Sequence, residues 1–149
     1  MKILTAVDQS PHSQRAIRFV TRMRWPAGSR VIVATVVPPA SPPVVGGDGG
    51  VPVLIDVGAE QRTEAQALVA QAESELRAAG IATESRVVTG DPRDVLLRWV
   101  EEERVDLIVV GSHGRTGFAK LLLGSVSSHV VTHARCNVLV VKEVSHEEA

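Results

Sequence analysis

The fold class is decided by one segment, Ile3-Leu4-Thr5-Ala6-Val7-Asp8-Gln9-Ser10-Pro11. Its first five residues form a largely apolar run, which a strand buried on both faces of a sheet requires. Ser10 then stands before Pro11, so a capping side chain precedes a proline at the first helical position. A buried strand that leads directly into a helix is the unit from which parallel α/β sheets are built.

The same alternation continues along the chain, with runs rich in Val and Ile separated by segments of helical spacing. We expect strands at Ile3–Val7, Val31–Val37, Thr83–Val88, Leu107–Val110 and Val138–Val141. Four helices are expected between and after these strands, three of them from apolar residues at helical spacing. The apolar face of the first is Ala16, Ile17, Val20 and Met23, and that of the second is Ala65, Leu68, Val69, Ala72, Leu76 and Ala79. The face of the third is Val95, Leu96, Trp99 and Val100, and the fourth helix is expected over 125–133. Asp91 before Pro92 marks a second capped start, and Gly80 is placed to end the second helix. This order predicts an α/β fold with an open, mostly parallel, three-layer sheet.

Domain organisation follows from the length of 149 residues, which fits one compact domain over 1–149. Residues 38–58 hold five prolines and five glycines and predict a long loop, either a functional lid or a tether without a specific role. Residues 144–149 are expected to form a flexible tail.

Composition excludes several classes of function. The net charge is −1 and there are four aromatic side chains without a tyrosine, which argues against nucleic-acid binding. The longest uncharged stretch carries clustered prolines, so no membrane-spanning helix is expected. The single cysteine, Cys136, excludes an internal disulfide. We therefore expect a soluble cytoplasmic protein.

The loop after the fourth expected strand carries most of the chemistry. Its glycines, Gly111 and Gly114, follow a buried strand and let the backbone approach an anion. Gly124 and Ser125 open the last helix, whose first N–H groups favour phosphate, and Arg115 adds a fixed positive charge. These features suggest a small ligand that carries phosphate. The alternative is that the glycines only make turns and Ser125 only caps the helix.

The spacing Gly111-x2-Gly114-x9-Gly124-Ser125 resembles the glycine motif of the ATP-binding branch of the universal stress protein family. The resemblance covers nearly the whole chain. Ile3–Ser10 is similar to the family's opening strand with its aspartate and serine, Thr89–Pro92 to the exit of its third strand, and Ala134–Val141 to its closing strand.

This resemblance implies a Rossmann-like fold, similar to the adenine nucleotide alpha hydrolases, with strand order 3-2-1-4-5. It implies a stress-response regulator that binds ATP, or AMP or cyclic AMP. We expect Mg²⁺ or Mn²⁺ beside the phosphates, because the loop offers one arginine against several negative charges. Asp8 and Val36 would hold the adenine end. The turn that contains Gly111 and Gly114 (the glycine turn) and the start of the last helix would hold ribose and phosphates. A homodimer through Val138–Val141 is also implied. The expected nucleotide-binding residues are Ala6, Val7, Asp8, Val36, Val110, Gly111, His113, Gly114, Arg115, Gly124, Ser125, Val126 and Ser127.

Two positions depart from the family pattern. Gln9 stands where glycine is frequent, and it could crowd the adenine side or point to solvent. Asn137 stands where proline is common and adds an N–H near the expected dimer edge. Two alternatives therefore stay open: a dimeric scaffold that binds no nucleotide, and a slow adenine-nucleotide hydrolase with His113 or Asp8 as general base. The chain has no P-loop lysine motif and no serine-hydrolase elbow.

Two of the remaining histidines could contribute to a metal site. His129 and His133 stand four apart on the expected last helix, with Cys136 three residues later, a spacing that zinc sites use. The glutamate of the zinc-hydrolase motif is absent, so we expect no metal site formed by the protein alone. His12 and His146 are expected on the surface.

Overall fold

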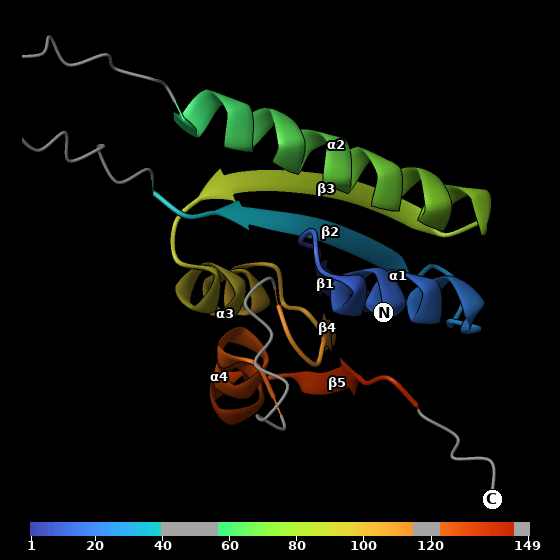
Figure 1. Cartoon of the computed structure of the whole chain (residues 1–149). Helices are drawn as coiled ribbons and strands as arrows, with labels where there is room; N and C mark the ends of the chain where they lie inside the picture. The colour runs from blue at the N-terminus through green and yellow to red at the C-terminus, as the bar shows by residue number, and fades with distance from the viewer. Residues whose placement is uncertain (40–56, 115–122, 145–149) are drawn as a thin grey trace, which may run out of the picture.

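The computed structural model describes residues 1–39, 57–114 and 123–144, with only the backbone of Val57. The elements alternate from strand to helix along the chain (Figure 1). They are β1 (Lys2–Ala6), α1 (Pro11–Arg22), β2 (Arg30–Val37), α2 (Val57–Ala78), β3 (Ala82–Thr89), α3 (Pro92–Glu102), β4 (Leu107–Gly111), α4 (Ser125–His133) and β5 (Asn137–Val141). The predicted β-α-β succession is confirmed.

The five strands form one sheet in the order β3-β2-β1-β4-β5, and every pairing is parallel. This confirms both the predicted fold class and the implied strand order. The order reverses between β1 and β4: the chain runs outward from β1 through β2 to β3, then returns to the other side of β1. Ligands of open α/β sheets bind at such a switch point.

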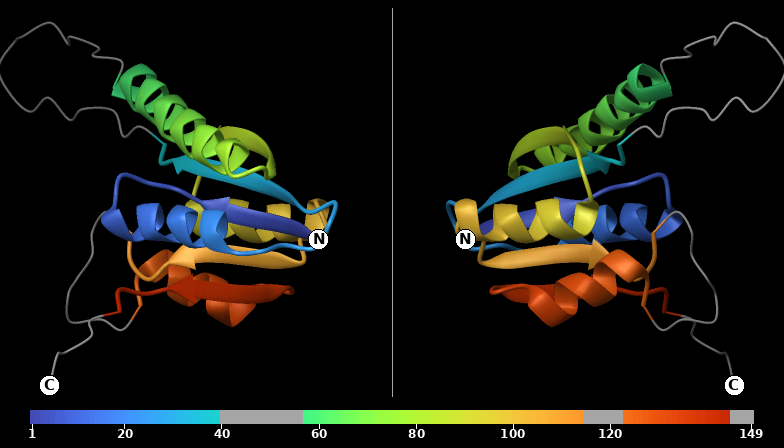
Figure 2. Two further views of the ribbon diagram at one scale, coloured as in Figure 1. Left: turned by 90° about the vertical axis from the view of Figure 1, so that its right-hand side faces the viewer. Right: turned by 90° about the vertical axis from the view of Figure 1, so that its left-hand side faces the viewer.

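Helices cover both faces of the sheet (Figure 2). On one face, α1 and α2 pack on alternate residues of the strands, with Ile17 and Leu76 fully buried against Ile3. On the other face, α3 and α4 pack with Leu96 and Val130 fully buried. Strands covered on both faces must be apolar on both, which explains their continuous runs of Val and Ile.

The helix starts follow the predicted capping chemistry. The Ser13 N–H donates to Ser10 Oγ at 3.2 Å, and the Arg93 N–H donates to Asp91 Oδ1 at 2.9 Å. In both helices a proline stands in the first turn, where its missing N–H costs nothing. Gly80 follows α2 with φ +78°, the left-handed conformation expected of it.

Two boundary predictions were wrong. Met23 does not belong to the buried face of α1: it is the C-cap residue in extended backbone and is 45% exposed. The chain leaves the helix there because it must turn toward β2. The expected loop over 38–58 ends too late, since Val57 and Gly58 already belong to α2. Its residues 40–56, like residues 145–149 of the expected tail, lie outside the described residues.

Within the described residues, no helix is both long enough and apolar enough to span a membrane.

The side chain of Thr5 destabilises the core, and a single substitution should remove this effect. Its side chain is fully buried in β1 between Val33 and Val109, and among the described residues its Oγ1 has no hydrogen-bond partner. A buried hydroxyl without a partner costs roughly 1–3 kcal/mol. Thr5→Val keeps the shape and removes that cost.

We expect Thr5→Val to raise the free energy of unfolding by about 1 kcal/mol and the Tm by roughly 2–4 °C in calorimetry. The matched control is Thr35→Val, because Thr35 Oγ1 is buried but donates to the Val7 carbonyl at 2.8 Å. That variant should lower the Tm. A lower Tm for Thr5→Val as well would contradict the assignment of an unpaired hydroxyl.

Asp91 makes stability depend on acid pH. Hydrogen bonds from the Arg93 side chain and backbone lower the pKa of Asp91 from 3.8 to about 2. A carboxyl whose pKa is lowered by folding stabilises the fold above its unfolded pKa and loses that contribution as the pH falls. Asp91→Asn keeps a capping side chain but cannot titrate. Between about pH 4 and pH 2, the Tm of the wild type should therefore fall more steeply than that of the variant.

Candidate functional site

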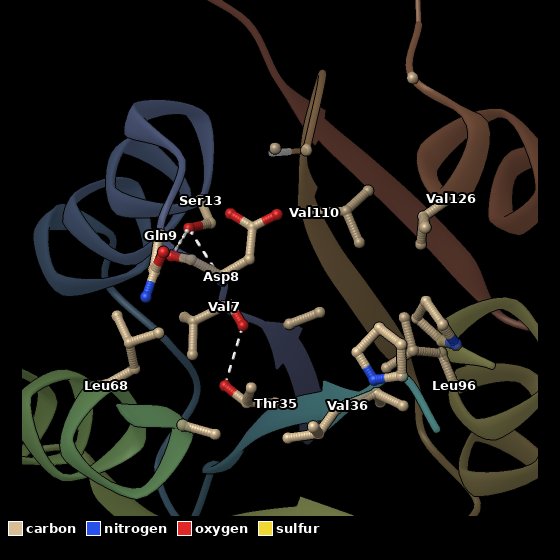
Figure 3. Close-up of a pocket in the computed structure, with 18 of the residues that line it drawn as sticks. Val7, Asp8, Gln9, Ser13, Thr35, Val36, Leu68, Leu96, Val110 and Val126 are labelled. Carbon is tan, nitrogen blue, oxygen red and sulfur yellow. Dashed lines mark hydrogen bonds between the residues drawn. The ribbon is translucent and has the colours of Figure 1, made fainter. Parts of the chain in front are cut away.

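A cavity of about 510 Å³ opens at the carboxyl ends of the central strands (Figure 3). It lies at the switch point between β1 and β4, where the order of the strands in the sheet reverses. Segments from all four helices contribute to its wall. The cavity therefore lies beside the loop after β4, where the sequence analysis predicts ligand binding.

The cavity gathers the residues that the sequence analysis selected. Every one that the structure describes lines it: Ala6, Val7, Asp8, Val36, Val110, Gly111, His113, Gly114, Gly124, Ser125, Val126 and Ser127. Arg115 lies outside the described residues. The placement of these residues is established, whereas their contacts to a ligand stay a prediction.

One part of the cavity is apolar. Val7 and Val36 line it from the ends of β1 and β2, Leu68 faces it from α2 and Leu96 from α3 (Figure 3). Apolar side chains from separate elements, with few polar groups between them, suit a flat organic ring.

The Asp8 carboxylate is held in place by the start of α1. Asp8 Oδ1 accepts the Ser10 N–H at 2.8 Å. The backbone carbonyl of Asp8 accepts the Ser13 hydroxyl at 2.8 Å. A side chain on Gly114 would begin 3.1 Å from Asp8 Oδ2. The turn after β4 therefore lies directly against this carboxylate.

Gly111 has a packing role that the sequence did not show. A Cβ at this position would lie 2.6 Å from the backbone carbonyl carbon of His12. Real Cβ atoms do not come that close to backbone, so only glycine lets α1 approach the end of β4. The glycine serves the fit between two elements of the protein as well as the shape of the cavity.

The start of α4 offers N–H groups to the other part of the cavity. Gly124, and not Ser125, is the N-cap residue, so the interpretation of Ser125 as a cap was wrong. Gly124 has no side chain with which to cap this helix, and Ser125, Val126 and Ser127 line the cavity. The first N–H groups of a helix have no intrahelical acceptor and favour anions.

The Ser112 carbonyl holds α4 in this position. It accepts the Gly124 N–H at 2.7 Å and the Ser127 hydroxyl at 2.9 Å. The helix start is thus bonded to the end of β4, which bears the glycine turn.

His12 was expected on the surface but is half-buried beside this turn. Its ring lies 5.1 Å from the ring of His113, centroid to centroid. The side chain of Arg15 contacts His12 Nδ1 at 3.4 Å and donates to Glu143, which follows β5, at 2.7 Å. The prediction failed because nothing in the local sequence shows that the first turn of α1 meets the end of β4. His146 lies outside the described residues.

The sequence analysis missed the contribution of α2. Gln61, Glu64, Ala65 and Leu68 line the cavity from this helix. Their helical spacing marks a common face. That spacing does not reveal that the face extends beyond the sheet to the switch point.

Other cavity residues outside the predicted set are Gln9, Ser13, Thr35, Val37, Pro38, Pro92 and Leu96.

Gln9 is exposed at the edge of the cavity that it lines. Its side-chain amide donates to Glu64 Oε2 at 2.9 Å, which connects the turn after β1 with α2 at the edge of the cavity. Asn137 differs from expectation. Its backbone N–H donates to the Asp106 carbonyl at 3.2 Å and so is engaged within the chain rather than offered to the sheet edge.

The histidines of α4 stack on each other, with ring centroids of His129 and His133 4.2 Å apart. Cys136 donates its thiol to the Asn137 carbonyl, and burial raises the pKa of that thiol. Among the described residues, no three His, Cys, Asp or Glu side chains are grouped so that they could hold a metal ion.

Comparison with known proteins identifies relatives. The model of the universal stress protein family matches residues 1–142. Universal stress protein A homolog 1 of Coxiella burnetii is 32% identical over 139 residues, which cover 93% of this chain and 94% of that protein. A universal stress protein A-like protein of Arabidopsis thaliana is 41% identical over 68 residues, which are 46% of this chain but only 39% of that protein.

Solved structures share the fold. That of a Methanocaldococcus jannaschii universal stress protein has a TM-score of 0.79 at 25% identity, covering 97% of this chain and 96% of that one. A universal stress protein in complex with cAMP has a TM-score of 0.70 at 26% identity, covering 95% and 96%. An Archaeoglobus fulgidus universal stress protein in complex with dAMP has a TM-score of 0.64 at 26% identity, covering 94% and 96%. This chain belongs to the universal stress protein family.

Proposed function

We propose that this protein binds an adenine nucleotide, with ATP as the main ligand, and acts as a nucleotide-dependent stress-response regulator. The observation that carries the proposal is the two-part character of the cavity at the switch point. An apolar part suits a base, and a part lined by a glycine turn and a helix start suits phosphates. Relatives at 26% identity have been solved with cAMP and dAMP, which supports adenine as the base.

At the base end, adenine would lie between Val36 and the apolar side chains of α2 and α3. Asp8 is a charged acceptor in the cavity wall, and its carboxylate is already oriented by the Ser10 N–H while Ser13 holds its backbone. Because its geometry is set before the ligand arrives, little ordering cost is paid on binding. Asp8 and the Val36 backbone would together fix the adenine end.

At the phosphate end, Gly114 and Gly124 bring the backbone close to the ligand. The N–H groups of Ser125 and Val126 at the start of α4 would donate to phosphate oxygens. Arg115, the charge predicted from sequence, would complete this end. Oxygen donors of this kind suit Mg²⁺ or Mn²⁺, which would be bound mainly by phosphate oxygens and water.

The protein would form a homodimer through β5, and this dimer would transmit the effect of nucleotide binding. This strand ends the sheet, and its residues Val138–Val141 are apolar and only half-buried. On the neighbouring helix, Val131 is 47% exposed. Pairing between two such edges would cover apolar surface and satisfy backbone groups that otherwise invite aggregation. Nucleotide would act by preferring one state of this dimer. The cytoplasm is the proposed location.

Binding can be tested by calorimetric titration of nucleotide-stripped protein with ATP and Mg²⁺. We expect saturable binding in the low-micromolar range. Asp8→Asn should weaken it about tenfold or more, because hydrogen bonds to charged groups contribute roughly 1.5–3 kcal/mol. Gly114→Ala should weaken it moderately, and Gly114→Val should abolish it, because the side chain grows toward Asp8 Oδ2, 3.1 Å from its Cβ.

Asp94→Asn, on the exposed surface of α3, is the control and should leave affinity unchanged. No binding of any adenine nucleotide by the wild type would reject the proposal. A scaffold of the same fold would then be the better account.

The dimer can be tested by sedimentation equilibrium, which should give twice the chain mass of 15.9 kDa. Val140→Lys places a charge in the edge strand and should yield monomers. The control is Val144→Lys, just beyond the strand at a residue that is 71% exposed, and it should remain dimeric. A monomeric wild type at all concentrations would refute the β5 dimer.

A further inference from the structure

A second cavity, of about 360 Å³, adjoins the one in which the proposed nucleotide would bind. The two cavities share four lining residues, which are Pro38, Pro92, Ser125 and Val126. Ser125 and Val126 are also the residues whose N–H groups would donate to phosphate oxygens. A phosphate chain bound at the start of α4 would therefore lie at the boundary between the two cavities, and its far end would enter the second one.

The second cavity supplies a fixed positive charge. Arg93 lines it from the first turn of α3, whereas Asp8 and Glu64 in the first cavity are both acidic. Among the described residues that line either cavity, Arg93 is the one arginine, and none is a lysine. A guanidinium keeps its charge at every pH at which proteins are folded, and its planar N–H groups match the oxygens of a phosphate.

Asp91 holds the guanidinium of Arg93 in place. Arg93 Nε donates to Asp91 Oδ1 at 3.1 Å, and Arg93 Nη2 donates to Asp91 Oδ2 at 2.7 Å. Asp91 Oδ1 also accepts the backbone N–H of Arg93 at 2.9 Å, which ties the carboxylate to the start of α3. This pairing uses two of the five N–H groups of the guanidinium, so three remain for another acceptor. The side chain of Arg93 is 49% exposed, which leaves these groups accessible to a ligand.

We propose that Arg93 binds the distal phosphates of the nucleotide and so selects a triphosphate over a monophosphate. This proposal rests on the proposed nucleotide function. The pair of Asp91 and Arg93 is neutral as a whole, so it attracts an anion little from a distance. A phosphate in contact with the remaining N–H groups accepts charge-assisted hydrogen bonds, which are roughly twice as strong as neutral ones. A monophosphate, whose one phosphate would be bound at the start of α4, gains nothing from Arg93.

The quantity that tests this role is the ratio of the Kd for AMP to the Kd for ATP, measured by calorimetric titration of nucleotide-stripped protein with Mg²⁺ present. The wild type should bind ATP about tenfold or more tightly than AMP. Arg93→Gln should lower the ratio about tenfold through weaker binding of ATP, which is the effect expected for the loss of hydrogen bonds between charged groups.

A double variant, Asp91→Asn with Arg93→Gln, separates direct contact from a change of charge. In Arg93→Gln alone, the Asp91 carboxylate loses its partner and repels phosphate. The double variant is neutral at this place, as the wild-type pair is, and its asparagine still caps α3. It should also lower the ratio about tenfold, because the N–H groups of Arg93 are gone. Arg98→Gln removes a charge from the same helix at a residue that lines neither cavity, and it should keep the wild-type ratio.

Thermal unfolding checks that each variant folds, and the double variant decides alone if Arg93→Gln does not fold. A wild-type ratio in the double variant would overturn this inference, even where Arg93→Gln lowers the ratio, because repulsion by Asp91 would then explain the effect. Equal affinity of the wild type for AMP and ATP would overturn it as well. In both cases nucleotide is bound and the proposed function stands. Absence of binding of either nucleotide by the wild type would overturn both proposals.

Discussion

The close approach of α1 to the end of β4 is the constraint on which the site depends. At Gly111 the backbone of His12 occupies the space where any Cβ would stand, at 2.6 Å. This contact brings the turn after β1, with Asp8, against the turn after β4, with Gly114. A larger residue at 111 would separate α1 from the sheet and widen the switch point. The shape of the cavity is thus set first by the packing of α1 against the end of β4.

A second contact orients the other part of the cavity. The Ser112 carbonyl binds both the Gly124 N–H and the Ser127 hydroxyl, and so ties the start of α4 to the end of β4. The hydroxyl of the same residue contacts both His113 and His12. One buried serine therefore holds an anion-favouring helix start with its backbone and two imidazoles with its side chain.

Much of this arrangement could be predicted from local patterns. Apolar runs and the caps at Ser10 and Asp91 located the strands and helices, because burial on both faces and capping are short-range requirements. The glycine spacing selected residues that prove to share one cavity. Met23 was misplaced because periodicity does not show where α1 ends. The half-buried His12 and the cavity face of α2 were missed because they lie where distant segments meet. Periodicity gives the apolar side of a helix but not what lies beyond its ends.

The sequence by itself determined the element order, the parallel sheet and the family, since these follow from apolar periodicity and a spaced glycine motif. Only the tertiary structure decided that Gly111 is glycine for the sake of α1, that Gln9 binds Glu64, and that Ser112 lies between two histidines. Each of these is a contact between segments far apart in the chain. Such contacts depend on how helices settle on the sheet, and the packing of the whole core sets that to within fractions of an ångström.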